Sequence, residues 1–355
     1  MRVLISQLFT FLSCFLFSQI PPGYYNSAQG LKGNTLKVAL HQIIKNHTVI
    51  PYSGLWSAFQ KTDRKSNGKV WDIYSFKPSG AQPYEYTFVT DQCGSYNSEG
   101  DCFNREHTWP QSWFNSTSGP DSDMFHIYPS DGYVNNQRGN FPFGNVANPS
   151  WTSQNGSKVG PCSNTGYSST AFEPINEFKG DLARSYFYMT TRYYSEDAGW
   201  ASSPATNKSE ILSWQLNVLM QWHHQDPVSA KEIARNDSIY YLYQNNRNPF
   251  IDNPAFADSI WASTATYLFD ETLTPRDYVL CYPQPVNDKM TIQSTCESIT
   301  VHEVIIYHLN GEVVFNKALD AVLSESVDLS ALTPAVYIMQ LKTSEGLIHL
   351  KLLKQ

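Results

Sequence analysis

The sequence lacks a surplus of positive charge. Its 355 residues carry 25 Lys and Arg against 32 Asp and Glu, so the formal net charge is −7, and charged residues make up only 16% of the chain. Non-specific attraction to polyanions rests on Lys and Arg, so this balance argues against a protein that holds nucleic acid by charge alone. The 14% aromatic content in turn excludes a disordered or collagen-like chain.

Long apolar runs are also missing after the first 20 residues. At the start, Arg2 precedes an apolar stretch from Val3 to Phe17, which predicts a signal peptide over residues 1–19. No later run could span a bilayer, so we expect no stable membrane insertion. The protein is therefore predicted to be secreted or held at the cell surface after passing through the periplasm.

None of the six cysteines forms a CxxC pair, which makes a zinc ribbon unlikely by spacing. Cys14 lies in the predicted signal peptide. In an exported protein the remaining cysteines are expected to form disulfides. Sequence proximity favours Cys93–Cys102 and Cys281–Cys296, which leaves Cys162 free.

The chain is long enough for two domains, and its composition changes near residue 280. Upstream we predict an α+β domain over 20–279, mainly helical with a small irregular sheet. Its expected helices are 34–47, 181–194, 210–224 and 228–243, and its expected strands are 69–75 and 84–90. Over 280–355, short β-type runs at 301–308, 312–315 and 335–341 predict a small all-β sandwich.

The chemistry is concentrated between Asp101 and Gly144. Glu106 offers a hard oxygen ligand next to His107, a side chain that can accept a proton near neutral pH. Arg138 adds a fixed cation, and amide oxygens come from Asn135, Asn136 and Asn140. This combination suits metal-assisted hydrolysis of a phosphodiester, although a structural loop with satisfied turns could contain the same residues.

The order and spacing of these residues resemble the endonuclease I family, nucleases with a His-Me (ββα-metal) finger. The shared positions are Asn104, Glu106, His107, Pro110, Ser112, Asp123, His126, Pro129, Val134, Asn135, Arg138, Asn140 and Phe143. Two further blocks agree, FEPINEFKGDLARSYFYM at 172–189 and the segment 222–252 that closes on NRNPF. The resemblance covers residues 36–252 in collinear order.

The resemblance implies a role for each matching residue. His107 is expected to be the general base, and Glu106 and Asn135 the direct ligands of one divalent cation, Mg²⁺ with other divalent cations as alternatives. Arg138 is expected to contact the phosphate or the transition state. Asn140 is the alternative amide ligand, and the expected supporting partners are Asp123 and His126, with direct ligation by His126 as the alternative.

The resemblance leaves the cation at the leaving group open. Some relatives carry an arginine in a long insertion that is replaced here by the short, cation-free loop 114–122. Its role would pass to Arg138, Arg184 or Arg247, or to a metal-bound water. We expect the strip that binds nucleic acid to comprise Lys179, Arg184, Arg247 and Asn248, with Arg138 beside it. The alternative for Lys179 and Arg184 is ion pairing with Glu173 or Asp181.

The last 75 residues resemble the type A sorting domain of type IX secretion cargo in Bacteroidetes. The matching stretches are YPQPVNDKMTI at 282–292, VIIYHLNGEVV at 304–314, VDLSALTPAVYIMQL at 327–341 and the closing HLKLLKQ. Gln284 and Ala335 depart modestly from the usual pattern. The type IX secretion machinery is therefore the expected partner of this region.

Together these features predict a secreted, monomeric, sequence-non-specific endonuclease. Its expected substrate is DNA, with RNA as a second substrate, and its products would carry 5′-phosphate ends. The alternatives are a nucleic-acid or polysaccharide binding protein with an inactive nuclease fold, and a metal-dependent phosphodiesterase acting on small substrates. Because the chain is acidic, we expect weak and salt-sensitive substrate binding.

Overall fold

The computed structural model describes residues 20–261, 278–294 and 299–355. The chain divides into two compact units, Met1–Ala265 and Thr266–Gln355, which are described separately. The predicted signal peptide over 1–19 lies outside the described residues. Among the described residues, no helix has both the length and the apolar character needed to cross a bilayer.

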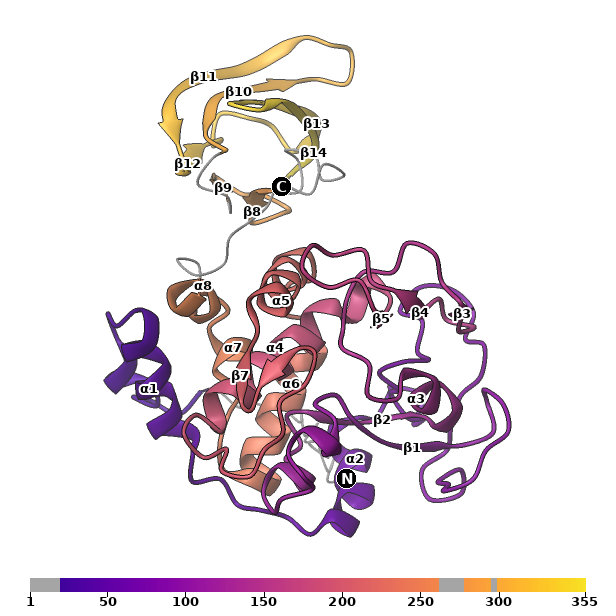
Figure 1. Ribbon diagram of the computed structural model, residues 1–355. Coiled ribbons are helices and arrows are strands. Elements are labelled where there is room, and N and C mark those ends of the chain that lie inside the picture. Colours follow the sequence, from indigo (N-terminus) through magenta and orange to yellow (C-terminus); the bar gives the residue numbers. More distant parts are fainter. Residues whose placement is uncertain (1–19, 262–277, 295–298) are drawn as a thin grey trace, which may run out of the picture. The chain divides into compact units, whose positions relative to one another are not determined.

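The N-terminal unit is built around one buried helix, α4 (Lys179–Arg192), in which every residue is buried. Helices α1 (Gly33–Ile44), α5 (Ser213–Gln225) and α7 (Pro249–Asp252) pack against it (Figure 1). The remaining helices are α2 (Leu55–Thr62), α3 (Gly132–Arg138), α6 (Ala230–Ile239) and α8 (Ala255–Trp261). A helix without an exposed face needs polar partners inside the unit, and α4 supplies several of the buried charges described below.

Each predicted helix is present with shifted ends. The expected helix 34–47 is α1, which buries its apolar residues Leu36, Leu40 and Ile44. The expected helix 228–243 is α6, which begins at a Ser229–Glu232 capping box. It continues as a π-helical turn, η6 (Tyr240–Gln244), and ends at Asn245 with a left-handed backbone (φ 57°).

The two strands predicted at 69–75 and 84–90 are wrong, because both segments consist of turns and irregular backbone. The cause is visible at Asp72, whose Oδ1 accepts the backbone N–H groups of Tyr74 and Ser75 at 2.7 and 3.0 Å. A side chain that binds its own backbone in this way competes with a β-ladder. The apolar residues nearby are nevertheless buried.

The sheets of this unit are small. Strands β1 (Phe103–His107) and β2 (Ile127–Asp131) form an antiparallel pair in which His107 lies opposite Ile127. The chain passes from β2 directly into α3, which packs on β1. The other strands are β3 (Trp151–Thr152), β4 (Lys158–Pro161) and β5 (Thr170–Glu173) in one sheet, and β6 (Thr206–Asn207) and β7 (Glu210–Ile211) in another.

The C-terminal unit is all β. One sheet has the order β12-β9-β8, from Ser324–Asp328, Lys289–Ser294 and Val279–Tyr282. The second has the order β11-β10-β13-β14, from Val313–Val322, Val301–Tyr307, Ala335–Thr343 and Gly346–Lys354. Both sheets bury aliphatic side chains in one core, with Met290, Ile306 and Leu341 fully buried. Together with the N-terminal unit this gives the expected α+β class.

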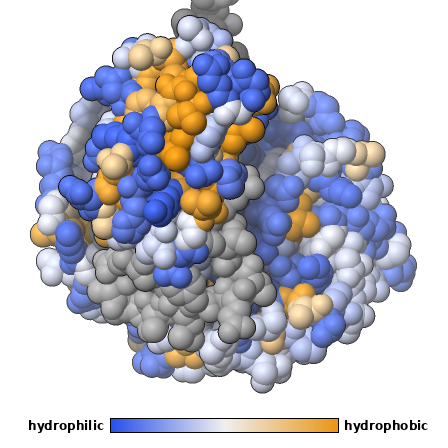
Figure 2. Space-filling view, turned by 90° about the horizontal axis from the view of Figure 1, so that it is seen from above, coloured by the Kyte–Doolittle hydropathy of each residue, from blue (hydrophilic) through white to orange (hydrophobic). Residues whose placement is uncertain are grey.

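Apolar side chains also reach the surface of the C-terminal unit. Leu309, Val313 and Leu347 are each more than half exposed. A patch of apolar residues is visible on the face of the molecule shown in Figure 2.

The cysteines follow the predicted pattern only in part. Cys93 and Cys102 form the predicted disulfide, and Cys162 is free and buried. Cys281 is also free, which contradicts the predicted Cys281–Cys296 pair. Its expected partner Cys296 lies outside the described residues.

Candidate active site on β1, β2 and α3

The predicted base and ligands meet where β1 ends and α3 begins. Asp131, the last residue of β2, caps α3 by accepting the N–H of Val134 at 2.8 Å. Gly132 follows, and a Cβ at this position would collide with the ring of Tyr96. Glycine therefore leaves room for the Tyr96 ring at the turn from β2 into α3. The turn brings Asn135, on the first turns of α3, next to the strand that carries Glu106 and His107.

His107 is the last residue of β1 and is 7% exposed. Its Nε2 lies 3.2 Å from the carbonyl oxygen of Asp121. A carbonyl can only accept, so Nε2 carries the hydrogen and Nδ1 holds the lone pair. Burial lowers the pKa of His107 to about 3, with a further contribution from His126. The ring is therefore neutral at pH 7, which is the form that can accept a proton.

Tyr52 fixes the ring of His107 from one side. The two rings are stacked, with centroids 5.7 Å apart and planes inclined by 27°. Tyr52 comes from the turn before α2, which sequence reasoning did not include in the site. An aromatic residue in a turn, more than fifty positions from the histidine, gives no signal of such a contact.

Glu106 is a buried carboxyl with 2% of its surface exposed. Its Oε1 accepts from the Tyr74 hydroxyl at 2.8 Å and lies 3.1 Å from Nη1 of Arg138. Burial raises the pKa of Glu106 to about 7, against the opposing effects of Arg138 and the Tyr74 hydrogen bond. Arg138 thus offsets only part of the cost of burying the charge of Glu106. A cation near the second carboxylate oxygen of Glu106 would favour the charged form.

Asn135 has its amide oriented by the neighbouring strand. Its Nδ2 donates to Oδ1 of Asn104 at 2.7 Å and to the carbonyl of Arg105 at 3.4 Å. In the described part of the chain, no hydrogen bond uses Oδ1 of Asn135. The side chain therefore keeps its oxygen available, as an amide ligand must.

These two side chains fit a hard divalent cation. A carboxylate oxygen and an amide oxygen are the donors that Mg²⁺ and Ca²⁺ prefer, and Mg²⁺ commonly keeps several waters. No cluster of three or more His, Cys, Asp or Glu suited to a metal is present among the described residues. A metal at this site would therefore depend on Glu106, Asn135 and water.

Arg138 does not lie where a phosphate could reach it, which corrects the prediction made for it. It is 1% exposed. Besides its ion pair with Glu106, its guanidinium donates to the carbonyls of His107 and Thr108 at 3.0 and 2.5 Å. Nη1 and Nη2 thus hold the end of β1 against α3, while the buried Nε has no hydrogen-bond partner among the described residues. Arg138 is a positioning residue for Glu106 and His107.

The structure places the predicted supporting residues behind His107. The His126 ring lies 5.5 Å from the His107 ring, and its Nε2 is 2.6 Å from the Pro120 carbonyl. Asp123 is fully buried and accepts hydrogen bonds from Tyr188, Tyr193 and Gln244 at 2.9–3.0 Å. Asn140, the alternative ligand, is exposed and follows the end of α3.

The predicted strip for nucleic acid is wrong, because its members are buried. Arg184 is fully buried and binds Glu232 through Nε and Nη2 at 2.5 and 2.9 Å. Arg247 is paired with Asp237 and Asp252 at 2.7 and 2.6 Å. Two further members are engaged by the fold in the same way: Lys179 pairs with Glu173 at 2.8 Å, and Asn248 caps α7.

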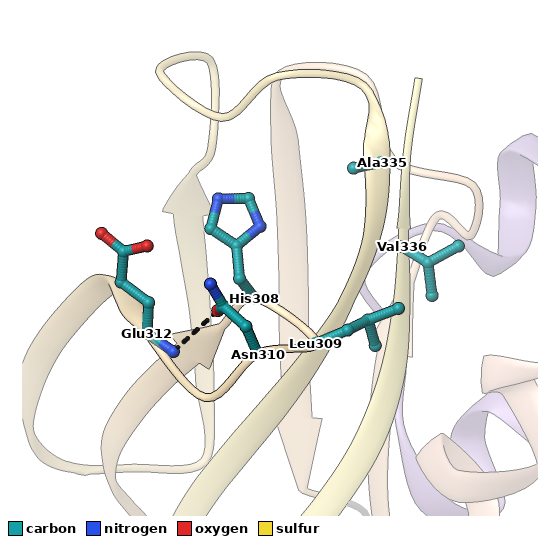
Figure 3. A pocket seen from close by; sticks show the side chains of 6 residues that line it. All are labelled: His308, Leu309, Asn310, Glu312, Ala335 and Val336. Carbon is teal, nitrogen blue, oxygen red and sulfur yellow. Dashed lines mark hydrogen bonds between the residues drawn. The ribbon is translucent and has the colours of Figure 1, made fainter.

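A pocket elsewhere in the chain contains none of these residues. It lies at the β10–β11 turn of the C-terminal unit (Figure 3). Its lining residues are His308, Leu309, Asn310, Glu312, Ala335 and Val336. The Asn310 side chain accepts the backbone N–H of Glu312 at 3.1 Å, as in an ordinary Asx turn. The pocket is formed by this turn and the start of β13, and none of its lining residues belongs to the predicted site.

Comparison with known proteins identifies the families of both parts of the chain. The sequence pattern of the endonuclease I family matches residues 32–255, and that of a secretion system C-terminal sorting domain matches residues 280–355. The extracellular ribonuclease of Bacillus amyloliquefaciens is 38% identical over 246 residues, which cover 67% of this chain and 78% of that protein. The extracellular ribonuclease of Bacillus subtilis (strain 168) is 36% identical over 249 residues, with the same coverage.

A more distant relative is the extracellular deoxyribonuclease of Aeromonas hydrophila. It is 28% identical over 225 residues, which cover 61% of this chain and 86% of that protein. The sorting domain and these extracellular relatives identify a nuclease that is secreted or displayed at the cell surface, with a link to type IX secretion. With its family pattern spanning more than half of the chain, the protein belongs to the endonuclease I family.

Proposed function

We propose that this nuclease is a metal-dependent endonuclease that hydrolyses both DNA and RNA without sequence preference. The observation that carries the proposal is the arrangement of His107, whose Nε2–H is held by the Asp121 carbonyl while Nδ1 is left to act as a base. Glu106 and the Asn135 amide would hold one divalent cation, with Mg²⁺ as the expected ion. We also propose that the β1–β2–α3 unit is the ββα-metal finger of this family.

In the reaction, Nδ1 of His107 takes a proton from a water molecule, and the water oxygen attacks the scissile phosphorus. The bond from phosphorus to the 3′ oxygen breaks, the leaving oxygen takes a proton from solvent, and the phosphate remains on the 5′ end. When bound, the cation supplies positive charge that stabilises the scissile phosphate and the leaving oxygen. The Asp121 carbonyl stabilises the His107 imidazolium formed in this step.

The RNA part of the proposal follows from the same chemistry. Attack by water does not use the ribose 2′-hydroxyl, so the same groups can cleave either polymer. Two relatives are named as ribonucleases and one as a deoxyribonuclease. Activity on both RNA and DNA suits a site that contacts the phosphodiester and not the sugar.

A nicking assay on supercoiled plasmid, and a parallel assay on single-stranded RNA, test the proposal. We expect cleavage with Mg²⁺, none with EDTA, and a loss of about 10²–10⁴-fold for His107→Ala. Product 5′ ends should accept a kinase label only after phosphatase treatment. His223→Ala is the matched control, because His223 is buried beside Arg184 and not near β1.

Two results would contradict the proposal. Full cleavage by His107→Ala would show that His107 is not the base. Equal cleavage with EDTA and with Mg²⁺ would show that the reaction does not depend on a metal. Binding of nucleic acid without any cleavage would favour the inactive-fold alternative.

A further inference from the structure

Arg105 is a cation of the site that has no assigned role. It precedes Glu106 on β1, and the alternation of a strand places it on the same face as His107. Two residues along a strand span roughly 6.6 Å. Its guanidinium group is thus carried by the same rigid element as the base.

Two aromatic rings fix the Arg105 head group. Its Cζ lies 3.7 Å from the ring centroid of Tyr52 and 4.5 Å from that of Trp56. Nη1 donates to the Tyr52 carbonyl at 3.0 Å. Tyr52 is the ring that also stacks on His107. The rings immobilise the guanidinium before any substrate arrives, which lowers the entropy that a phosphate contact would cost.

Arg105 also keeps donors for a ligand. It is only half-buried. In the described part of the chain it forms no ion pair, and neither its Nε nor its Nη2 is a buried atom without a partner. A planar guanidinium whose Nε and Nη2 make no hydrogen bond within the described part of the chain can bind phosphate in bidentate fashion.

The other arginines of this unit that the structure describes do not compete for the role. Five of them are buried and used by the fold: Arg138, Arg184, Arg192, Arg235 and Arg247. Arg64 is exposed and stacks on Phe88 at 5.7 Å, and among the described residues it has no contact with Glu106, His107 or Asn135. Arg105 is thus the described arginine of this unit that lies on β1 near His107 and keeps donors free of the fold.

We propose that Arg105 binds the phosphodiester backbone of the substrate next to His107 and so holds the strand in place for attack. The proposal rests on the proposed function. The contact is made in the ground state as well as in the transition state, so it acts mainly on substrate binding.

The test uses the full-length protein and two readouts. The first is cleavage kinetics on a short fluorescent DNA duplex with Mg²⁺. The second is the dissociation constant of the same duplex in EDTA, measured by fluorescence anisotropy at several salt concentrations. For Arg105→Ala we expect KM and the dissociation constant to rise about tenfold. The salt slope, which is the steepness with which the logarithm of the binding constant falls with the logarithm of the salt concentration, should decrease by about one.

Two further variants separate the phosphate contact from a structural effect. Arg105→Lys keeps the charge, so it should retain the salt slope and recover part of the affinity. Arg64→Ala removes the other accessible, ring-stacked arginine, and it should leave all values unchanged. Circular dichroism of each variant reports whether the fold is intact.

The outcomes are distinct. If Arg105→Ala lowers kcat while KM and the salt slope stay as in wild type, Arg105 merely supports Tyr52 and His107, and the proposal is overturned. An unchanged enzyme overturns it as well. If wild type fails to cut at all, the proposed function fails, and the salt slopes in EDTA still show whether Arg105 meets a phosphate.

Discussion

The two units of this chain keep very different interiors. The C-terminal sandwich is filled with aliphatic side chains, and its buried polar residues within the described ranges are Ser294 and Thr343. The N-terminal unit buries entire ion pairs, such as Arg184–Glu232 and Arg138–Glu106. Buried charge is costly and must be paired, whereas aliphatic packing needs no partner. The catalytic unit accepts that cost in order to fix charged groups in and around its site.

The largest effect should come from breaking one of these pairs. Arg184→Met leaves Glu232 buried and uncompensated, so we expect a loss of about 3–5 kcal/mol in the free energy of unfolding. All nine tryptophans precede residue 262, so tryptophan fluorescence in urea follows this unit alone. Arg64→Met, at an exposed site, should change stability by less than about 0.5 kcal/mol. A loss below about 1 kcal/mol for Arg184→Met would show that the Arg184–Glu232 pair contributes little to the stability of this unit.

The matching change in the sandwich removes apolar volume. Leu341 is fully buried on β13, and Leu341→Ala should destabilise the C-terminal unit by about 2–5 kcal/mol. Calorimetry should show one transition moving to lower temperature while the tryptophan-detected transition stays in place. If both transitions moved together, the two units would not unfold independently, and their stabilities could not be compared separately.

A smaller effect is expected from the disulfide of the N-terminal unit. Cys93–Cys102 closes a loop just before β1. Replacing both residues by serine should cost about 2–3 kcal/mol, since a short closed loop restricts the unfolded chain only modestly. Tryptophan-detected unfolding with and without reductant gives the value, and the double variant should no longer respond to reductant. A reductant effect that persists in that variant would point to another thiol.

The smallest effect for each step of one pH unit comes from a single buried acid. Burial raises the pKa of Asp72 to about 7, with a further contribution from Asp131. A raised pKa means that folding favours the protonated form, so this stabilisation is complete below about pH 4 and is lost as pH rises toward 7. Asp72→Asn cannot ionise, so its stability relative to wild type should increase over that range by at most about 1.4 kcal/mol per pH unit. A constant difference from pH 4 to 7 would contradict the assignment.

Local patterns in the sequence predicted the parts of the site that depend on neighbouring residues. The adjacent Glu106-His107 pair and the Cys93–Cys102 disulfide both follow from short-range order. The same reasoning placed α1 and α6 within a few residues, because helical apolar spacing marks them.

The sequence pattern did not distinguish an arginine that faces solvent from one that is buried. Arg184 and its partner Glu232 are 48 positions apart, and their pairing depends on how α4 docks against α6. Arg105 has no sequence signal of its own that would distinguish it from a structural arginine on β1. Its aromatic partner Tyr52 is 53 positions away. Neither contact has a signature in the local sequence, since both are made by tertiary packing.

Glu232 ties helix initiation to helix docking. Its carboxylate accepts the backbone N–H of Ser229 at 2.8 Å, which completes the capping box of α6, and it also binds Arg184 in α4. The first turn of α6 is therefore fully formed only when α4 is in place. This end of α6 should not fray by itself, and its amide protons should exchange with solvent only when the two helices separate.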